Sequence, residues 1–145
     1  MNDAALDAMM REYAQAAVTY ARDVAHRELD YSVESLQTVE LILETYHCDL
    51  PRGLFARLFR RGPSEQEIER MAQIFGAYLG EVIRRHLGGE WQPEHPLSPE
   101  IPGMIVGGTM IAPWSKAYKR IVDGPGANLL FFYRVLSNQV KQRAE

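Results

Sequence analysis

The chain begins with a segment in which apolar residues recur every three or four positions. In residues 4–28 charged side chains fall mostly on the other side of this stripe, which consists of Leu6, Met9, Tyr13, Ala17, Tyr20 and Val24. This spacing predicts an amphipathic helix. The pattern breaks at "LDYSVES", where Ser32, or Asp30 in its place, is a candidate cap for a second helix predicted over 33–47.

A capping box marks the start of a third helix. In "SEQE" at 64–67, the Ser64 side chain accepts the free amide of the third residue on, and Glu67 reaches back to the amide of Ser64. The helix is predicted to run to about Leu87, where Gly88 and Gly89 supply a left-handed stop. Before it, "LFARLFRR" predicts one or two helical turns.

The pattern then changes from helical to extended. "EWQPE" is a candidate short strand, "HPLSPEIPG" has too many prolines to be regular, and "MIVGGTMI" predicts a strand or a tight hairpin about Gly107-Gly108. Pro113 suits the first turn of a helix over "WSKAYKRIV", and a last helix is predicted over 127–142. We therefore expect an α+β fold, mainly helical, with about five helices and a small antiparallel β element between the third and fourth helices.

Composition limits the classes of protein to consider. The 145 residues suffice for a single globular domain, 1–145, and 46% of them are hydrophobic. The net charge of −3 argues against bulk affinity for nucleic acid or anionic lipid. There is no signal-peptide pattern, no apolar run of the ~20 residues that span a membrane, and one cysteine, Cys48. A cytoplasmic protein without membrane or nucleic-acid partners is expected.

The sequence contains no motif of metal, nucleophilic or phosphate-loop chemistry. The four histidines do not form HExxH or HxxxH, and no CxxC, GxSxG or GxxxxGK[ST] occurs. We therefore predict no metal, no cofactor and no catalytic residue.

Two glycines inside the third helix need an explanation. Gly76 and Gly80 share one helix face, and each costs about 1 kcal/mol relative to alanine. Close approach of another backbone is the favoured explanation, and a ligand lying against the helix is the alternative. Glu81 adjoins this face and can pair with Arg84 or Arg85 on the helix surface; alternatively, it is an acid/base group or cation ligand at the foot of a pocket.

Two candidate surfaces follow. If a ligand pocket exists, we expect it between the glycine face, the tryptophan strand and the proline-led helix, lined by Asp30, Tyr78, Glu81, Trp91, Trp114 and Arg120. A candidate partner surface is the basic and aromatic stretch that includes Arg57, Phe59, Arg60 and Arg61.

The order of these features resembles a group of small bacterial domains of unknown function. Their pattern is a G-x-Y-x-G-E-like helix, a tryptophan strand and a proline-led helix with a Lys-Arg step. It spans residues 29–124 here, with matching positions at Gly76, Tyr78, Gly80, Glu81, Trp91, Pro113, Lys119 and Arg120. The resemblance implies a bacterial cytoplasmic origin and an α+β fold, and it implies no catalytic residue.

Three hypotheses on function remain open. The favoured one is a non-enzymatic protein-interaction module of a regulatory or immunity-like kind. The alternative is a small-molecule binder or unrecognised enzyme with its pocket around Gly76–Glu81, Trp91 and Trp114–Arg120. The third is a homo-oligomer whose interface uses the first or the last helix.

Overall fold

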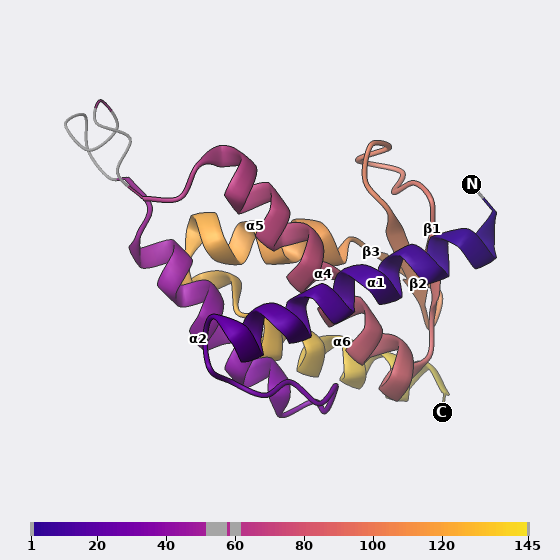
Figure 1. The fold of residues 1–145 in the computed structure, drawn as a ribbon. Coiled ribbons are helices and arrows are strands. Elements are labelled where there is room, and N and C mark those ends of the chain that lie inside the picture. Colours follow the sequence, from indigo (N-terminus) through magenta and orange to yellow (C-terminus); the bar gives the residue numbers. More distant parts are fainter. Residues whose placement is uncertain (1, 52–57, 59–61, 145) are drawn as a thin grey trace.

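The protein is seen in a computed structural model, which describes residues 2–51, 58 and 62–144. In these residues it has five α-helices and a three-stranded antiparallel sheet, which confirms the predicted mainly helical α+β class (Figure 1). The predicted turns at "LFARLFRR" and the candidate partner residues Arg57, Phe59, Arg60 and Arg61 lie outside the described residues.

The elements follow one another in the predicted order, with the sheet between the third and fourth of the helices in the described residues. They are α1 (Asp3–Asp23), α2 (Ser35–Cys48), α4 (Glu65–Leu87), β1 (Glu90–Gln92), β2 (Gly103–Val106), β3 (Thr109–Ile111), α5 (Pro113–Asp123), the 3₁₀ helix η1 (Pro125–Ala127) and α6 (Leu129–Ala144).

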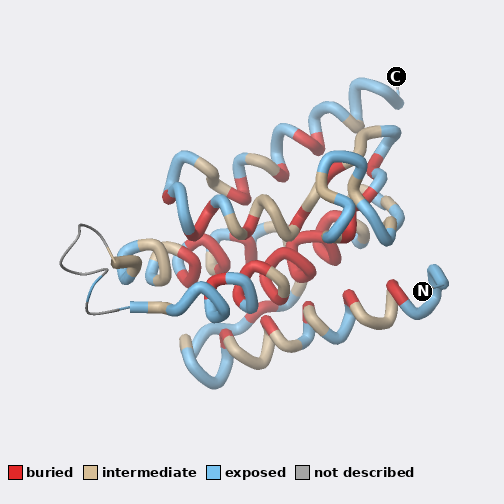
Figure 2. Tube along the Cα trace, turned by 90° about the horizontal axis from the view of Figure 1, so that it is seen from above, coloured by how far each residue is buried: buried red, intermediate tan, exposed pale blue. Residues whose placement is uncertain are grey.

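Helix α4 is the central element of the fold. From Ile68 to Ile83 most of its residues are buried, including an unbroken run from Ile74 to Ile83 (Figure 2). Its most extensive contacts are with α1 and α5. The sequence pattern of α4 is amphipathic, yet the helix is covered on more than one face. Apolar residues and the two glycines occupy the second covered face as well.

The predicted stripe of α1 is confirmed in part: Leu6 and Ala17 are buried and Met9, Tyr13 and Tyr20 pack against the core at its edge. The buried side is formed mainly by small residues and consists of Leu6, Met10, Ala14, Ala17 and Ala21. Helix α1 also ends at Asp23 rather than at 28, and Val24 is 58% exposed. Beyond the helix the Arg27 amide donates to the Ala21 carbonyl (2.9 Å) and Leu29 is buried, so the chain turns back toward the core.

The predicted cap of Ser64 and the stop at Gly88 are confirmed, while the return bond from Glu67 to the Ser64 amide is not found among the described residues. The Glu67 amide donates to Ser64 Oγ (3.1 Å), and Gly88 ends α4 with a φ of 79°. The Ser35 amide donates to Ser32 Oγ (3.1 Å), so Ser32 supplies the predicted cap although α2 itself begins at Ser35.

The sheet is a hairpin with one further strand. Thr109 pairs with Val106 across a two-residue turn at Gly107-Gly108, whose φ values of 54° and 81° are those of a type I′ turn. The sequence left a strand and a hairpin open, and the structure shows the hairpin. A buried cross-strand row (Trp91, Met104 and Ile111) joins the core cluster, to which every helix and strand named above except η1 contributes.

Candidate ligand-binding pocket

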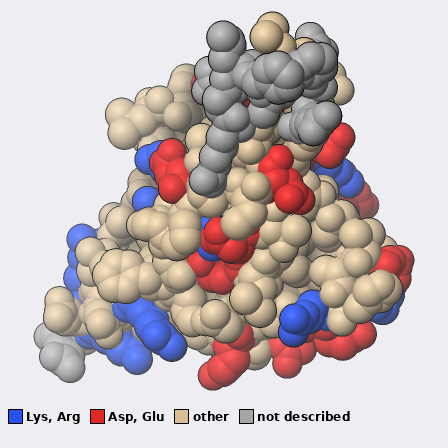
Figure 3. All heavy atoms as spheres, turned by 90° about the vertical axis from the view of Figure 1, so that its left-hand side faces the viewer, with Lys and Arg blue, Asp and Glu red and all other residues tan. Residues whose placement is uncertain are grey.

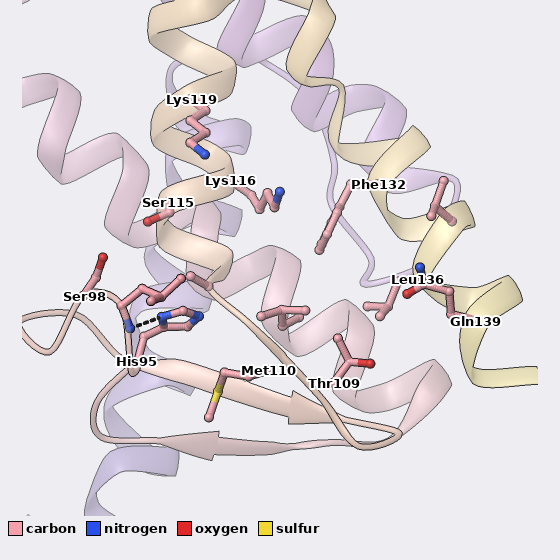
Figure 4. A pocket seen from close by; sticks show the side chains of 14 residues that line it. His95, Ser98, Thr109, Met110, Ser115, Lys116, Lys119, Phe132, Leu136 and Gln139 are labelled. Carbon is pink, nitrogen blue, oxygen red and sulfur yellow. Dashed lines mark hydrogen bonds between the residues drawn. The ribbon is translucent and has the colours of Figure 1, made fainter. Parts of the chain in front are cut away.

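A pocket of about 450 Å³ is lined by residues of β3, α5 and α6 and by the loop after β1 (Figure 4). Its volume is within the range of small-molecule sites. Four consecutive residues, 109–112, line it along β3, and α6 contributes Phe132, Val135, Leu136 and Gln139. The pocket therefore unites segments that are separated by as many as 44 positions in the sequence.

Two lysines enter the pocket from α5. Helix α5 begins at Pro113. Lys116 and Lys119 stand three residues apart in it and are therefore neighbours on one face of the helix. The Lys116 ammonium lies 4.8 Å from the centroid of the Phe132 ring, a cation–π arrangement (Figure 4). The aromatic ring thus holds one positive charge over the apolar part of the pocket.

The charge of the pocket is opposite to that of the chain. No aspartate or glutamate lines it, and among the described residues neither Lys116 nor Lys119 forms an ion pair. The net charge of the whole chain is nevertheless −3. Burial, and after it the positive charge of Lys119, lower the pKa of Lys116. Both causes disfavour the ammonium ion, and the negative charge of a bound anion would directly offset the repulsion from Lys119.

His95 adds a polar group on the loop side. The Leu97 amide donates to its Nδ1 (3.1 Å), so in the neutral ring the proton is on Nε2, which is then a donor. Ser98 and Ser115 add hydroxyl groups. The apolar lining extends outward to Leu97, which is 88% exposed, and Val135, which is 39% exposed. The combination suits a ligand that has both a negative charge and an apolar part.

The six residues predicted as a ligand site are placed differently. Glu81 is only 1% exposed, and both of its oxygens accept from the Arg84 guanidinium (2.9 and 3.0 Å). Its Oε2 also accepts from Trp91 Nε1 (3.1 Å), and Trp91 is itself buried. The predicted helix-surface pair is therefore formed with Arg84, and it is completed by the tryptophan of β1.

The protein itself fills the space beside both glycines, but the predicted approach of a backbone is confirmed at Gly76 only, since a side-chain ring lies against Gly80. A Cβ atom at Gly76 would lie 2.6 Å from the Trp114 Cα atom, and one at Gly80 would lie 2.2 Å from the Trp91 ring. On this face of α4, the contacts with α5 and β1 leave no space for a side chain at either glycine. The glycines are explained by packing against the first turn of α5 and the indole of β1.

Tyr78 and Asp30 stabilise the connection between α1 and α2. The buried Tyr78 hydroxyl accepts from the Tyr31 amide (2.8 Å) and is hydrogen-bonded to Ser35 Oγ (2.6 Å). Tyr31 has a φ of 63°, a left-handed conformation that is rare for an aromatic residue. Asp30 is exposed and accepts from the Ser32 amide (3.0 Å), a bond that lowers its pKa together with the Ser32 side chain.

Arg120 belongs to a buried ion-pair cluster. Its Nε donates to Glu40 Oε1 (2.8 Å) and its Nη2 donates to Glu44, while Nη1 is buried without a hydrogen-bond partner among the described residues. Glu40 also accepts from the Asn128 side chain (2.7 Å) and the Leu129 amide (2.9 Å). The cluster thereby connects α2, α5 and the start of α6.

Trp114 alone of the six lines a hollow next to the pocket. This hollow of about 370 Å³ lies between α4 and α5 and shares Ser98, Ser115 and Lys119 with the pocket. It also contains the carboxylates Glu69 and Glu100, so its lining has mixed charge. The six residues do not meet in the pocket of Figure 4, and their role in ligand binding stays a prediction.

The predicted pocket region Trp114–Arg120 includes Ser115, Lys116 and Lys119, but none of these three was named as a ligand residue, and the walls from β3 and α6 were not predicted. The sequence contained one signal: Lys116 and Lys119 stand three apart in the helix that follows Pro113. The apolar wall of the pocket comes from α6. Since α6 had no predicted position relative to β3, its contribution could not be anticipated.

Two other kinds of site receive no support in the described part of the chain. Within it, no three or more side chains of His, Cys, Asp or Glu are grouped so that they could hold a metal ion. None of its helices has the length and apolar character needed to cross a membrane. Figure 3 shows one face of the molecule, on which acidic and basic side chains both occur and neither sign covers the whole face.

Comparisons with protein-family models, with curated proteins and with solved structures found no match for this chain. Function is therefore inferred from the pocket and its chemistry.

Proposed function

We propose that this chain is a non-enzymatic binding module that holds an anionic ligand with an apolar part in the pocket between β3, α5 and α6. The observation that carries the proposal is the pair Lys116 and Lys119. They line a pocket without a single carboxylate, in a chain of net charge −3. Charge complementarity of this kind favours one sign of ligand and excludes the other.

The cost of this arrangement supports a binding role. A partly buried ammonium without an ion pair loses hydration, and the lowered pKa of Lys116 reflects that loss. The ring of Phe132 offsets the loss in part. A carboxylate on a bound ligand would supply the missing counter-charge.

The absence of a catalytic arrangement in the pocket supports binding over chemistry. His95 Nδ1 accepts from a backbone amide, so no carboxylate orients the ring in the way that a general base is oriented in a catalytic triad. No aspartate or glutamate is among the described lining residues, which leaves His95 and the two lysines as the groups there that can carry a proton. The lysines and serines can still bind and orient an anion.

Hydrocinnamate, a carboxylate with a phenyl group, tests this proposal. We expect it to shift the backbone NMR signals of Lys116, Lys119 and Phe132. Its uncharged amide should bind at least about fivefold more weakly, which corresponds to ~1 kcal/mol. Lys116→Met and Lys119→Met should each weaken binding, whereas Lys141→Met should not, because Lys141 lies exposed in the last turn of α6 outside the pocket.

Two results would contradict the proposal. One is equal binding of the acid and the amide, which would remove the role of charge. The other is a set of shifted signals away from β3, α5 and α6, which would place the site elsewhere.

A further inference from the structure

β3 is an edge strand of the sheet, and it lines the pocket along its whole length. The sheet order is β1-β2-β3, and among the described residues no further strand pairs with β3. The pocket is lined by every residue from Thr109 to Ala112. An unpaired edge carries free backbone donors and acceptors and is a template for an added strand.

The turn decides which backbone groups are free. In a hairpin with a two-residue type I′ turn, the pair that closes the turn, here Val106 and Thr109, exchanges both hydrogen bonds. The bonding alternates along the strand, so the Ile105–Met110 pair is not hydrogen-bonded and the Met104–Ile111 pair is. The N–H and C=O of Met110 therefore point away from β2, toward the open edge.

The two ends of β3 meet different chemistry. Thr109 Oγ1 accepts from Arg143 Nη1 (2.6 Å), which ties this end to α6. At the other end the Lys116 amide donates to the Ala112 carbonyl (3.1 Å), so α5 and its lysines begin there. A strand added beside β3 would pass from the apolar wall of α6 to the positive charges of α5.

Alternation along a strand places every second side chain on the same face. Thr109 and Ile111 share one face, and Ile111 is buried in the core beneath the helices. An added residue opposite Thr109 would thus point toward α6, and the residue two positions away would point toward Lys116 and Lys119. The residue between them would form both hydrogen bonds with Met110.

We propose that the ligand is an extended acidic segment of a partner protein that pairs with the free edge of β3, with an apolar side chain toward α6 and a carboxylate two residues away toward Lys116 and Lys119. This inference rests on the proposed function, since both use the same pocket. A second copy of this chain does not suit the edge, because its β3 strand, Thr-Met-Ile, carries no carboxylate to meet the lysines. The backbone bonds provide affinity and the alternate side chains provide selectivity, as in other cases of strand addition.

A capped pentapeptide of sequence Glu-Thr-Leu-Thr-Glu is the probe. The inferred pairing is antiparallel, in which the residue opposite Met110 exchanges both hydrogen bonds with it. The peptide then presents its leucine opposite Thr109, a threonine opposite Met110 and a glutamate opposite Ile111. We expect it to displace hydrocinnamate and to shift the NMR signals of Met110 and Lys116. Methylating the backbone nitrogens of both threonines removes the N–H that pairs with Met110 and should weaken binding about tenfold or more.

A protein variant repeats the test from the other side. Met110→Pro removes the outward N–H and leaves the β2–β3 bonds of Thr109 and Ile111 in place, and proline is tolerated at such edge positions. It should bind the peptide about tenfold more weakly. The methylated peptide needs no change in the protein, so the test stands even if this variant fails to fold.

Each outcome decides between the two proposals. If the methylated and unmethylated peptides bind equally, strand addition is wrong. If hydrocinnamate binds and the peptide does not, the partner inference is overturned while the proposed function stands. The same holds if the peptide binds without displacing hydrocinnamate. If neither binds, both are overturned.

Discussion

At the residue scale, the two glycines of α4 show how a local penalty is offset by packing. Gly76 and Gly80 each weaken a helix that would be more stable with alanine. Their lack of a side chain lets the first turn of α5 and the indole of Trp91 reach the backbone of α4. Trp91 in turn donates to Glu81 one residue further along, so the same contact satisfies a buried carboxylate.

Gly80→Ala should lower the free energy of unfolding by about 1–2 kcal/mol, because overpacking against the Trp91 ring outweighs the gain in helix propensity. Urea unfolding measures the change. Gly126→Ala is the control: a Cβ atom there meets no atom within 4 Å, and the change should stay within about 0.5 kcal/mol. A Gly80→Ala variant more stable than the parent would contradict the packing explanation.

Lys116 gives the pocket a pH dependence. The anion binds to the ammonium form, and the pKa of that ammonium is lowered in the free protein. Affinity for hydrocinnamate should therefore be constant at neutral pH and fall as the pH rises, and the fall should begin below the pH at which an ordinary lysine loses its proton. Binding raises the pKa of Lys116 again, so proton uptake should accompany binding in this range.

The facing groups allow the effect to be assigned. Lys119 on the same helix and His95 on the loop are the other titratable groups in the lining, and α6 contributes only the uncharged Gln139 as a polar group. Calorimetric titration between about pH 8 and pH 11, above the range in which histidine titrates, should show the fall. It should persist in Lys141→Met and change in Lys116→Met. A profile that is identical in Lys116→Met would contradict the assignment to Lys116.

At the scale of elements, one buried carboxylate connects three helices. Glu40 of α2 accepts from Arg120 of α5 and from Asn128 and Leu129 at the start of α6. These elements also carry the two helical walls of the pocket. The cluster therefore fixes the angle at which α5 and α6 face each other.

Glu40→Ala should lower the free energy of unfolding by about 3–5 kcal/mol, because Arg120 is left as a buried charge without its main partner. Glu44→Ala is the matched control, since the Glu44 side chain is 33% exposed and water can replace it. Chemical unfolding of both variants measures the difference. Equal losses would show that the buried position of Glu40 has no special weight.

At the scale of the whole molecule, the charge distribution bears on self-association. The β3 strand has no carboxylate that could meet the lysines of a second copy at that edge. Phe131, 68% exposed on α6, offers an apolar contact away from it. We expect light scattering to give the mass of a single chain at two concentrations well apart. A doubled mass that Phe131→Ser returns to a single chain would instead support the hypothesis of an oligomer through the last helix.

The sequence alone determined the elements, their order and several of their ends, although α1 ends at Asp23 rather than at the predicted residue 28. The capping box at Ser64, the stop at Gly88, the turn at Gly107-Gly108 and Pro113 at the start of α5 all act through neighbours in the chain, and their effects do not depend on distant parts of the fold. The need for a close approach at Gly76 and Gly80 was also visible. The side of α1 that is buried was less well determined, since alanines give a weak signal beside Met9, Tyr13 and Tyr20.

Only the tertiary structure decided what the chemistry-bearing residues contact. Glu81 and Trp91 lie ten positions apart and bind each other, and Arg120 reaches Glu40 across 80 positions. The pocket depends on α6 returning beside β3, with Phe132 under the Lys116 ammonium. Periodicity shows which face of a helix is apolar, but it does not show which other element packs against that face. The packing partner depends on how all the elements together bury their apolar surface. For that reason the sequence predicted the fold class and several boundaries, and the pocket between β3, α5 and α6 became visible only in the structure.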